Sequence, residues 1–422
     1  MSNVTESDFL HHIQTRGYLY QCTDIENLTK LMQQEPISGY IGFDCTAPSL
    51  HVGSLIQIML LRTLQQYGYK PIVLLGSATT RIGDPSGKDE ARAILSEQEI
   101  AKNKASILEV FKAFIQFDCG DTAKAVMVDN SDWLEELRYI DYLKEYGKFF
   151  SINKMLSMDS VKLRLERQQQ LSFLEFNYMV LQAYDFVELY RRYGCRLQLG
   201  GSDQWGNIVT GVDLGRRVGT PQLYGITSHL ITTSSGAKMG KTANGAVWLN
   251  QNALSVYDYW QFWRNTDDAD VVRFLKMFTE LPISEIDKLA QLKDKEINEA
   301  KIILANEATR LCHGQEAMEA ALKAAQGVFV DRLAVDGIPT YFITQEEIGE
   351  GMPIFKLLHK IGLTESGSMS KKLIQGKGVR VNDQLITDEC LLICNNDFNV
   401  SGLKISVGKK KHCLVRHSAR NS

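Results

Sequence analysis

Hydrophobic residues in the first half of the chain alternate between short continuous runs and longer stretches with helical spacing. Four short runs predict buried strands, at Tyr40–Asp44, Pro71–Gly76, Ala125–Asp129 and Arg196–Leu199. Between the first two runs, apolar residues recur with helical spacing from Leu50 to about Tyr67. Strands separated by helices predict an α/β fold, a parallel sheet with helices on both faces.

The second half of the chain has a different pattern. Residues from about 252 to 327 lack strand signals and are rich in Ala, Leu, Lys, Glu and Asp, which predicts a helical domain. A less regular stretch, 328–351, is predicted to be a linker with local structure. Residues 352–422 combine a short helical pair with strand-like pieces, which predicts a small α+β domain.

Composition favours a globular enzyme or binding protein without a membrane segment. Hydrophobic residues make up 44% and charged residues 23% of the 422 positions. The start lacks a basic region followed by an apolar stretch, and Ile56–Leu61 is far too short to span a bilayer. The eight cysteines are scattered without a CxxC pair, so we expect reduced thiols and no structural zinc. The expected location is the cytoplasm.

Charge is unevenly distributed along the chain. Residues 352–422 carry 12 Lys and Arg against 5 Asp and Glu, whereas the remainder carries 35 against 45. A basic tail on an acidic body favours a partner with phosphates, although a solvated cationic surface would give the same count.

Ligands of parallel α/β sheets bind beyond the carboxyl ends of the strands, so polar residues placed there are candidates for chemistry. Thr46 and His51 follow the first strand at a helix start, a natural seat for phosphate, and Gly53 permits close approach of a nucleotide. Taken alone, a histidine at a helix start is more often a cap or a packing residue. The loop residues 238–242 (KMGKT) place two lysines and a hydroxyl where they could clamp a polyphosphate, or could simply be solvated.

Three further segments contain candidate binding residues. After the second strand, Asp84 could accept an ammonium, and Lys88 with Arg92 could form a cationic lid; a charged turn is the alternative. Residues 173–193 form a strongly apolar predicted helix, with Tyr178, Gln182 and Asp185 on one face. An aspartate there is costly unless a ligand or a core partner satisfies it. After the fourth strand, residues 200–207 (GGSDQWGN) allow close ligand approach, with Asp203 available for ribose hydroxyls.

Together these segments resemble the class I tyrosyl-tRNA synthetases of bacterial type. His51–Ser54 (HVGS) is similar to the HIGH signature, and Lys238–Thr242 to the KMSKS signature. The segments YIGFDCTAPSLHVG, GDPSGK, NYMVLQAYDF and GGSDQWGN occur in the order of the family. Residues 352–422 resemble an RNA-binding domain of the ribosomal protein S4 type. The resemblance covers nearly the whole chain.

The resemblance implies a role for each matching position. The substrate phenol would contact Tyr40 and Asp185; the α-ammonium would contact Asp84, Tyr178 and Gln182; and Gln204 would lie near the carboxylate. The adenylate would lie against Gly42, Asp44, Gly53, Ser54, Gly201, Asp203 and Lys241. The catalytic residues acting on the phosphates would be Thr46, His51, Lys88, Arg92, Lys238, Lys241 and Thr242.

The resemblance also implies the architecture and the partners. Residues 1–250 would form a Rossmann-like catalytic domain with a helical insertion at about 130–195, and 251–327 a helical domain that binds the anticodon arm. The expected ligands are L-tyrosine, ATP with Mg as co-substrate and no dedicated protein metal site, and tRNA(Tyr), with a homodimer and no membrane or DNA partner. The alternatives are a tryptophanyl-tRNA synthetase, or an RNA-binding or splicing protein with a relic synthetase site.

Three positions depart from the family pattern. Ser54 replaces the second histidine of HIGH, so its nucleotide contact must be weakened or rebuilt. Cys45 stands where many members have proline, which predicts a looser turn. Ile41 stands where some members place a cysteine near the ribose, and its side chain cannot hydrogen-bond. None removes the phosphate clamp, so activity is expected.

Overall fold

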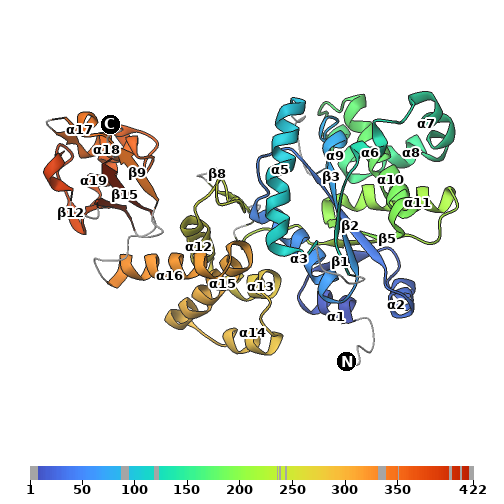
Figure 1. Ribbon diagram of the computed structural model, residues 1–422, viewed down its shortest axis with the longest axis horizontal. Helices are drawn as coiled ribbons and strands as arrows, with labels where there is room; N and C mark the ends of the chain where they lie inside the picture. The colour runs from blue at the N-terminus through green and yellow to red at the C-terminus, as the bar shows by residue number, and fades with distance from the viewer. Residues whose placement is uncertain are drawn as a thin grey trace. The chain divides into compact units, whose positions relative to one another are not determined.

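The computed structural model describes residues 8–86, 95–117, 123–234, 236, 239–242, 245–330, 339–349, 351–398, 402–408 and 411–417. It divides into two compact units, each treated separately below. Unit 1 comprises Met1–Ala253 and Thr266–Glu307, and unit 2 comprises Leu254–Asn265 and Ala308–Ser422. Figure 1 shows the elements of both units.

Unit 1 is built on a six-stranded sheet with the order β1-β6-β5-β2-β3-β4. Five strands are parallel, β2 (Ser38–Asp44), β3 (Lys70–Gly76), β4 (Val126–Asp129), β5 (Cys195–Gly201) and β6 (Tyr224–Ser228). The edge strand β1 (Leu19–Cys22) pairs antiparallel with β6, so the sheet is mixed rather than purely parallel. The four predicted strands are confirmed. The chain order reverses between β2 and β5, which makes their carboxyl ends the topological switch point of the sheet.

Helices of unit 1 cover the sheet and form the insertion after β4 (Figure 1). The core strand β3 is buried along nearly all its length, as expected for a strand with both faces covered. The helices are α1 (Asp8–Thr15), α2 (Ile25–Gln34), α3 (Val52–Gln66), α4 (Ser77–Thr80), α5 (Glu97–Phe114), α6 (Ser131–Leu134), α7 (Tyr139–Glu145), α8 (Ile152–Leu156), α9 (Asp159–Glu166), α10 (Phe173–Tyr193), α11 (Trp205–Arg217), α13 (Val271–Phe278) and α14 (Ile283–Leu289).

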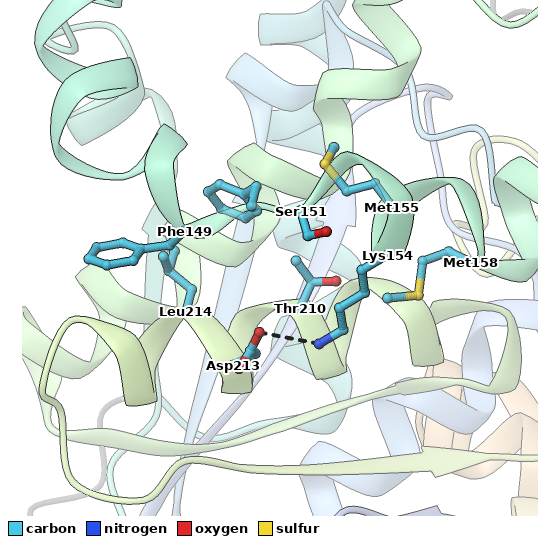
Figure 2. Close-up of a pocket in the computed structure, with 9 residues that line it drawn as sticks. Phe149, Ser151, Lys154, Met155, Met158, Thr210, Asp213 and Leu214 are labelled. Atoms are coloured by element: carbon cyan, nitrogen blue, oxygen red, sulfur yellow. Dashed lines mark hydrogen bonds and ion pairs between the residues drawn. The ribbon is translucent and has the colours of Figure 1, made fainter.

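The predicted apolar helix is α10, and its ends are set by local capping. Ser172 and Glu175 form a capping box at the N-terminus, and Gly194 ends the helix with a left-handed φ of 65°. α10 packs against α11, and the short helices of the insertion also meet α11. Figure 2 shows the crevice between them, where Lys154 of α8 approaches Asp213 of α11 at 3.2 Å.

Residues 266–307 belong to unit 1, whereas the sequence predicted one helical domain over 251–327. The Arg16 guanidinium after α1 holds this segment by donating to the carbonyl oxygens of Lys276, Thr279 and Leu281 at 2.9, 2.7 and 2.6 Å. Helix α15 (Ile297–His313) runs from unit 1 into unit 2. The helical stretch is therefore shared between the units.

Unit 2 contains α12 (Val256–Arg264), α16 (Gln315–Val330) and a five-stranded sheet with the order β12-β11-β14-β15-β9. These strands are β9 (Thr340–Ile343), β11 (Val379–Val381), β12 (Gln384–Ile386), β14 (Leu403–Val407) and β15 (Lys411–His417). The short strands β10 (Met352–Pro353) and β13 (Leu392–Ile393) pair separately, and the helices are α17 (Gln345–Ile348), α18 (Ile354–Lys360) and α19 (Gly367–Gln375). β9 falls in the predicted linker, yet it pairs in parallel with β15.

Two general features bear on function. In the described part of the chain, the cysteines at 22, 45, 195, 312, 390, 394 and 413 are free thiols. None of the helices described is long and apolar enough to cross a bilayer.

Candidate active site

A cleft of about 680 Å³ opens in unit 1 beyond the carboxyl ends of the parallel strands. The predicted site residues that line it come from β2, β5, α3 and α10 and from the loops beyond them: Tyr40, Gly42, Asp44, Thr46, His51, Gly53, Ser54, Asp84, Tyr178, Gln182, Asp185, Gly201, Asp203 and Gln204. The structure therefore brings most of the predicted residues to one cavity. Lys88, Arg92 and Lys238 lie outside the described residues, and Lys241 and Thr242 form the short strand β7 (Lys241–Thr242).

The most buried end of the cleft contains Tyr40 of β2 and Asp185 of α10. Both side chains are almost completely buried, and the Tyr40 ring packs edge-on against Phe186 with centroids 5.2 Å apart. The Tyr40 hydroxyl has no hydrogen-bond partner among the described residues. Burial, and then the nearby Asp185 carboxyl, raise the pKa of Tyr40 well above its usual value. This end of the cleft thus contains a neutral hydroxyl available to a ligand.

Two side chains that the sequence analysis missed hold the Asp185 carboxyl in place. Trp133 Nε1 donates to Oδ1 at 2.7 Å, and Asn130 Nδ2 donates to Oδ2 at 3.1 Å. Burial raises the pKa of Asp185 to about 7, against the opposing effect of these two hydrogen bonds. Asp44 and Asp129 add a smaller upward contribution to this pKa. The carboxyl therefore changes charge near neutral pH.

The Asp185 network continues through Asn130 and Thr79 to Asp44 at the end of β2. Asn130 Nδ2 also lies 2.9 Å from Thr79 Oγ1, which donates to Asp44 Oδ1 at 2.9 Å. Tyr178 donates to the other Asp44 oxygen at 3.1 Å. Asn130 directly follows β4, so the rule that polar residues after parallel strands form the site could have found it. Thr79 lies three residues after the end of β3, so the same rule covers it.

A second group of polar side chains lies around Asp84. Gln204 Nε2 donates to Asp84 Oδ2 at 2.7 Å, and the Ser86 N–H donates to Oδ1 at 2.9 Å. Gln182 Nε2 reaches Gln204 Oε1 at 3.2 Å. Asn207, absent from the predicted set, donates to Gln182 Oε1 at 3.0 Å. Asp84 is thus surrounded by side chains from three segments. These are its own loop, the turn after β5 and helix α10.

The two predicted phosphate-binding segments touch through their backbones. His51 caps α3, with Nδ1 accepting from the Gly53 N–H at 2.9 Å. Gly240 precedes β7 with φ of +90°, and a Cβ built there would lie 2.8 Å from His51 Nδ1 and 2.9 Å from the Gly53 nitrogen. A side chain at Gly240 would collide, so glycine is required for this contact.

The three departures from the family pattern have clear positions. Ser54 and Ile41 both line the cleft. The turn at Cys45 is held on both sides, because its N–H donates to Thr80 Oγ1 at 2.8 Å and its carbonyl accepts from Asn103 at 2.9 Å. Gln57, Gln198, His229 and Trp248 also line the cleft and were absent from the predicted set.

Comparisons with known proteins agree with this geometry. Residues 32–330 match the family of tRNA synthetases class I (W and Y). The chain is 58% identical to the tyrosine–tRNA ligase of Beijerinckia indica subsp. indica over 411 residues, 97% of each chain. It is 57% identical to that of Methylocella silvestris over 410 residues, 97% of this chain and 98% of the relative. A solved structure, the C-terminally truncated mitochondrial tyrosyl-tRNA synthetase of Aspergillus nidulans, superposes with a TM-score of 0.68 at 31% identity, covering 76% of this chain and 94% of that one. The chain therefore belongs to the class I tRNA synthetases, among the tyrosine–tRNA ligases.

Proposed function

We propose that the cleft of unit 1 activates L-tyrosine with ATP and then transfers the tyrosyl group to the 3′ end of tRNA(Tyr). The observation that supports this most directly is the pair at its buried end. Tyr40 offers a buried hydroxyl that has no partner among the described residues, and Asp185 offers a buried carboxyl on the same cavity. A phenol hydroxyl would complete both groups, because it donates to the carboxylate and accepts from Tyr40.

The polar group around Asp84 supports the placement of the amino acid. We assign the α-ammonium to Asp84, Tyr178 and Gln182, with Gln204 near the carboxylate. Tyr178 and Gln182 lie one helical turn apart on α10, which also carries Asp185. One rigid helix would therefore fix both ends of the bound tyrosine.

The nucleotide would occupy the part of the cleft over β5, β6 and the start of α3. Asp203 would bind the ribose, and Gly42, Asp44, Gly53, Ser54 and Gly201 would lie against the adenylate. The contact between Gly240 and the start of α3 supports a shared phosphate site, because it brings the two signature segments together. The phosphates would meet Thr46, His51, Lys88, Arg92, Lys238, Lys241 and Thr242.

The chemistry requires no protein nucleophile. An oxygen of the tyrosine carboxylate attacks the α-phosphorus, the bond to the β-phosphate oxygen breaks, and pyrophosphate leaves. A ribose hydroxyl at the end of the tRNA then attacks the acyl carbon, and AMP leaves with the bond electrons. The protein contributes orientation and positive charge where negative charge accumulates.

Mg²⁺ is proposed to enter with ATP, bound mainly by phosphate oxygens, as is usual for this ion. Within the described residues, no group of three or more His, Cys, Asp or Glu side chains could hold a metal ion.

Selection against phenylalanine follows from the same buried pair. Phenylalanine would leave the Tyr40 hydroxyl and the Asp185 carboxyl without the ligand hydroxyl as a partner, which costs free energy; tyrosine enzymes are the known example of this effect.

The test of the proposed function is pyrophosphate exchange into ATP with a panel of amino acids. Exchange with tyrosine alone is expected. Exchange with tryptophan instead would favour the tryptophanyl alternative, and no exchange would refute the proposal.

The basic C-terminal part of unit 2 is proposed to bind tRNA. Residues 352–422 carry an excess of positive charge, which attracts phosphates and weakens with added salt. Its resemblance to the S4 type of RNA-binding domain supports the same assignment.

A homodimer is proposed through the insertion of unit 1. Of the sixteen large hydrophobic side chains exposed in the described residues, nine lie between residues 139 and 174. Ile140 and Phe173 are 70% and 71% exposed. A contiguous apolar surface formed by these side chains would mark an interface. Sedimentation equilibrium of the wild type should give a dimer and Ile140→Asp a weaker one; a monomeric wild type at micromolar concentration would refute the assignment.

A further inference from the structure

A buried carboxylate of unit 1, Asp270, contacts the backbone that leads into the KMGKT segment (residues 238–242). Asp270 ends the short helix η3 (Asp268–Asp270) and is only 3% exposed. Its Oδ2 accepts a hydrogen bond from the backbone N–H of Ser234 at 2.7 Å. A buried carboxylate is stable only with polar partners, so the burial of Asp270 and the position of Ser234 depend on each other.

Arg273 links the same carboxylate to a second backbone group of that segment. It lies in α13, three residues after Asp270, and its Nη2 is 2.6 Å from Asp270 Oδ1. The same nitrogen donates to the carbonyl oxygen of Thr232 at 2.5 Å. The ion pair therefore holds a carbonyl and an N–H that are two residues apart in the chain. Because hydrogen bonds with a charged partner are stronger than those between neutral groups, the pair fixes the course of the backbone over residues 232–234.

The backbone held by this ion pair lies next to the phosphate-binding end of the KMGKT segment. The Met239 N–H, two residues before Lys241, donates to the Ile231 carbonyl at 3.0 Å. Beyond Lys241, the Val247 carbonyl accepts from the Val52 N–H of α3 at 2.9 Å. Lys241 therefore lies between two backbone attachments, one to α3 and one directly before the residues that the ion pair holds.

Helix α13, which carries Arg273, has a fixed position relative to α3. Its side chains Phe274 and Phe278 are buried, and the helix packs against α3. Glu280, just after α13, forms an ion pair with Arg62 of α3 at 2.6 Å. Since α3 begins directly after His51, both attachments of the KMGKT segment lead to the helix that carries the other phosphate-binding segment.

We propose that Asp270 and Arg273 are positioning residues for adenylate formation, which fix residues 232–234 and thereby place Lys241 and Thr242 against the phosphates of ATP. This inference rests on the proposed function. Neither side chain is among the described residues that line the cleft, so both act through the backbone. A displacement of about 1 Å near a reacting group can slow a reaction about 100-fold, so this backbone anchor affects the rate directly.

The test is Arg273→Met in single-turnover formation of the tyrosyl adenylate. Methionine keeps most of the apolar stem and removes the guanidinium that holds Thr232 and Asp270. The rate at saturating ATP and tyrosine should fall about 10- to 100-fold, whereas the dissociation constant for tyrosine, measured by equilibrium dialysis, should stay the same. Arg273→Lys keeps one cation and should restore part of the rate.

A second variant and a control come from the same short helix. Asp270→Asn keeps the shape of the side chain and an oxygen for Ser234, but it removes the ion pair with Arg273. It should also slow adenylate formation without changing tyrosine binding. Asp268→Asn is the matched control, because Asp268 is exposed and pairs with Lys301, and its rate should equal that of the wild type.

A double variant tests whether the ion pair acts through Lys241. Lys241→Ala removes the cation that the pair is proposed to place. Adding Arg273→Met to that variant should therefore reduce the rate by a smaller factor than it does in the wild type. Equal factors in both backgrounds would overturn the proposed route through Lys241.

The remaining results separate this inference from the proposed function. An active wild type together with unchanged adenylate formation in Arg273→Met and Asp270→Asn would overturn the positioning role alone. So would a parallel loss of rate and tyrosine affinity in both variants, because that pattern indicates a general loss of structure. Failure of the wild type to exchange pyrophosphate with tyrosine would overturn the proposed function, and the inference with it.

Discussion

Replacing Trp133 by phenylalanine should move the pH at which the enzyme binds tyrosine. Trp133 Nε1 donates to Asp185 Oδ1 at 2.7 Å and favours the charged carboxylate, while burial holds the pKa of Asp185 at about 7. Phenylalanine fills most of the same space but donates no hydrogen bond. The second donor, Asn130, remains in place.

The size of the effect follows from the strength of the hydrogen bond that is removed. A hydrogen bond to a charged group contributes about 1.5–3 kcal/mol, and about 1.36 kcal/mol corresponds to one pKa unit, so the pKa of Asp185 should rise from about 7 to roughly 8–9. At pH 7 about half of the wild-type carboxyls are ionised, but only roughly 1–10% of those in the variant. If the ionised form binds the phenol, tyrosine affinity at pH 7 should fall by about 5- to 50-fold.

Equilibrium dialysis with labelled L-tyrosine between about pH 6 and pH 9 measures this directly. Wild-type affinity should increase as the pH passes through about 7, and the Trp133→Phe curve should be displaced to higher pH and recover at its alkaline end. Tyr142→Phe is the matched control, because its hydroxyl donates to the Val180 carbonyl in the same core and not to Asp185. Superimposable curves for wild type and Trp133→Phe would refute the reasoning.

The raised pKa of Asp185 also makes the free energy of unfolding depend on pH. This dependence has the opposite sign to that of most carboxyl groups, whose pKa is lowered by folding. The folded-state pKa of Asp185 is raised from 3.8 to about 7, so the folded protein binds the proton more tightly than the unfolded chain. Its contribution to the free energy of unfolding therefore decreases as the pH rises from about 4 to about 7. Bound tyrosine should offset part of that loss by pairing with the carboxylate.

Three further predictions concern the phosphates and the tRNA. Lys241→Ala should slow adenylate formation by about 100-fold or more in single turnover, with little change in tyrosine binding; equal losses in both would contradict the assignment. Gly240→Ala would place a methyl 2.8 Å from His51 Nδ1 and should slow pyrophosphate exchange by at least about tenfold, whereas Gly236→Ala, with a similar φ of +82° but open space around it, should not. A chain ending at residue 330 should keep pyrophosphate exchange but charge tRNA poorly, and its charging should depend less steeply on salt than that of the full chain; unchanged charging would exclude a role for the C-terminal domain.

The sequence alone predicted four of the six strands of the unit 1 sheet and many of the residues that line the cleft. Local hydrophobic periodicity and end signals predict strands β2 and β3 and the helix Phe173–Tyr193. Polar residues after parallel strands predicted the cleft, because in such sheets the carboxyl ends of the strands form one edge. The order of residues along the chain was sufficient to predict these features.

Tertiary structure decided which groups meet and how they are charged. Asn130 and Trp133 lie 55 and 52 residues before Asp185 in the sequence, and no local pattern shows that these two donors hold a carboxyl on α10. The pKa of Asp185 near 7 likewise depends on burial among distant segments. The physical reason is that desolvation and hydrogen bonding depend on distances in space, whereas sequence periodicity reports only the nearest turn or strand.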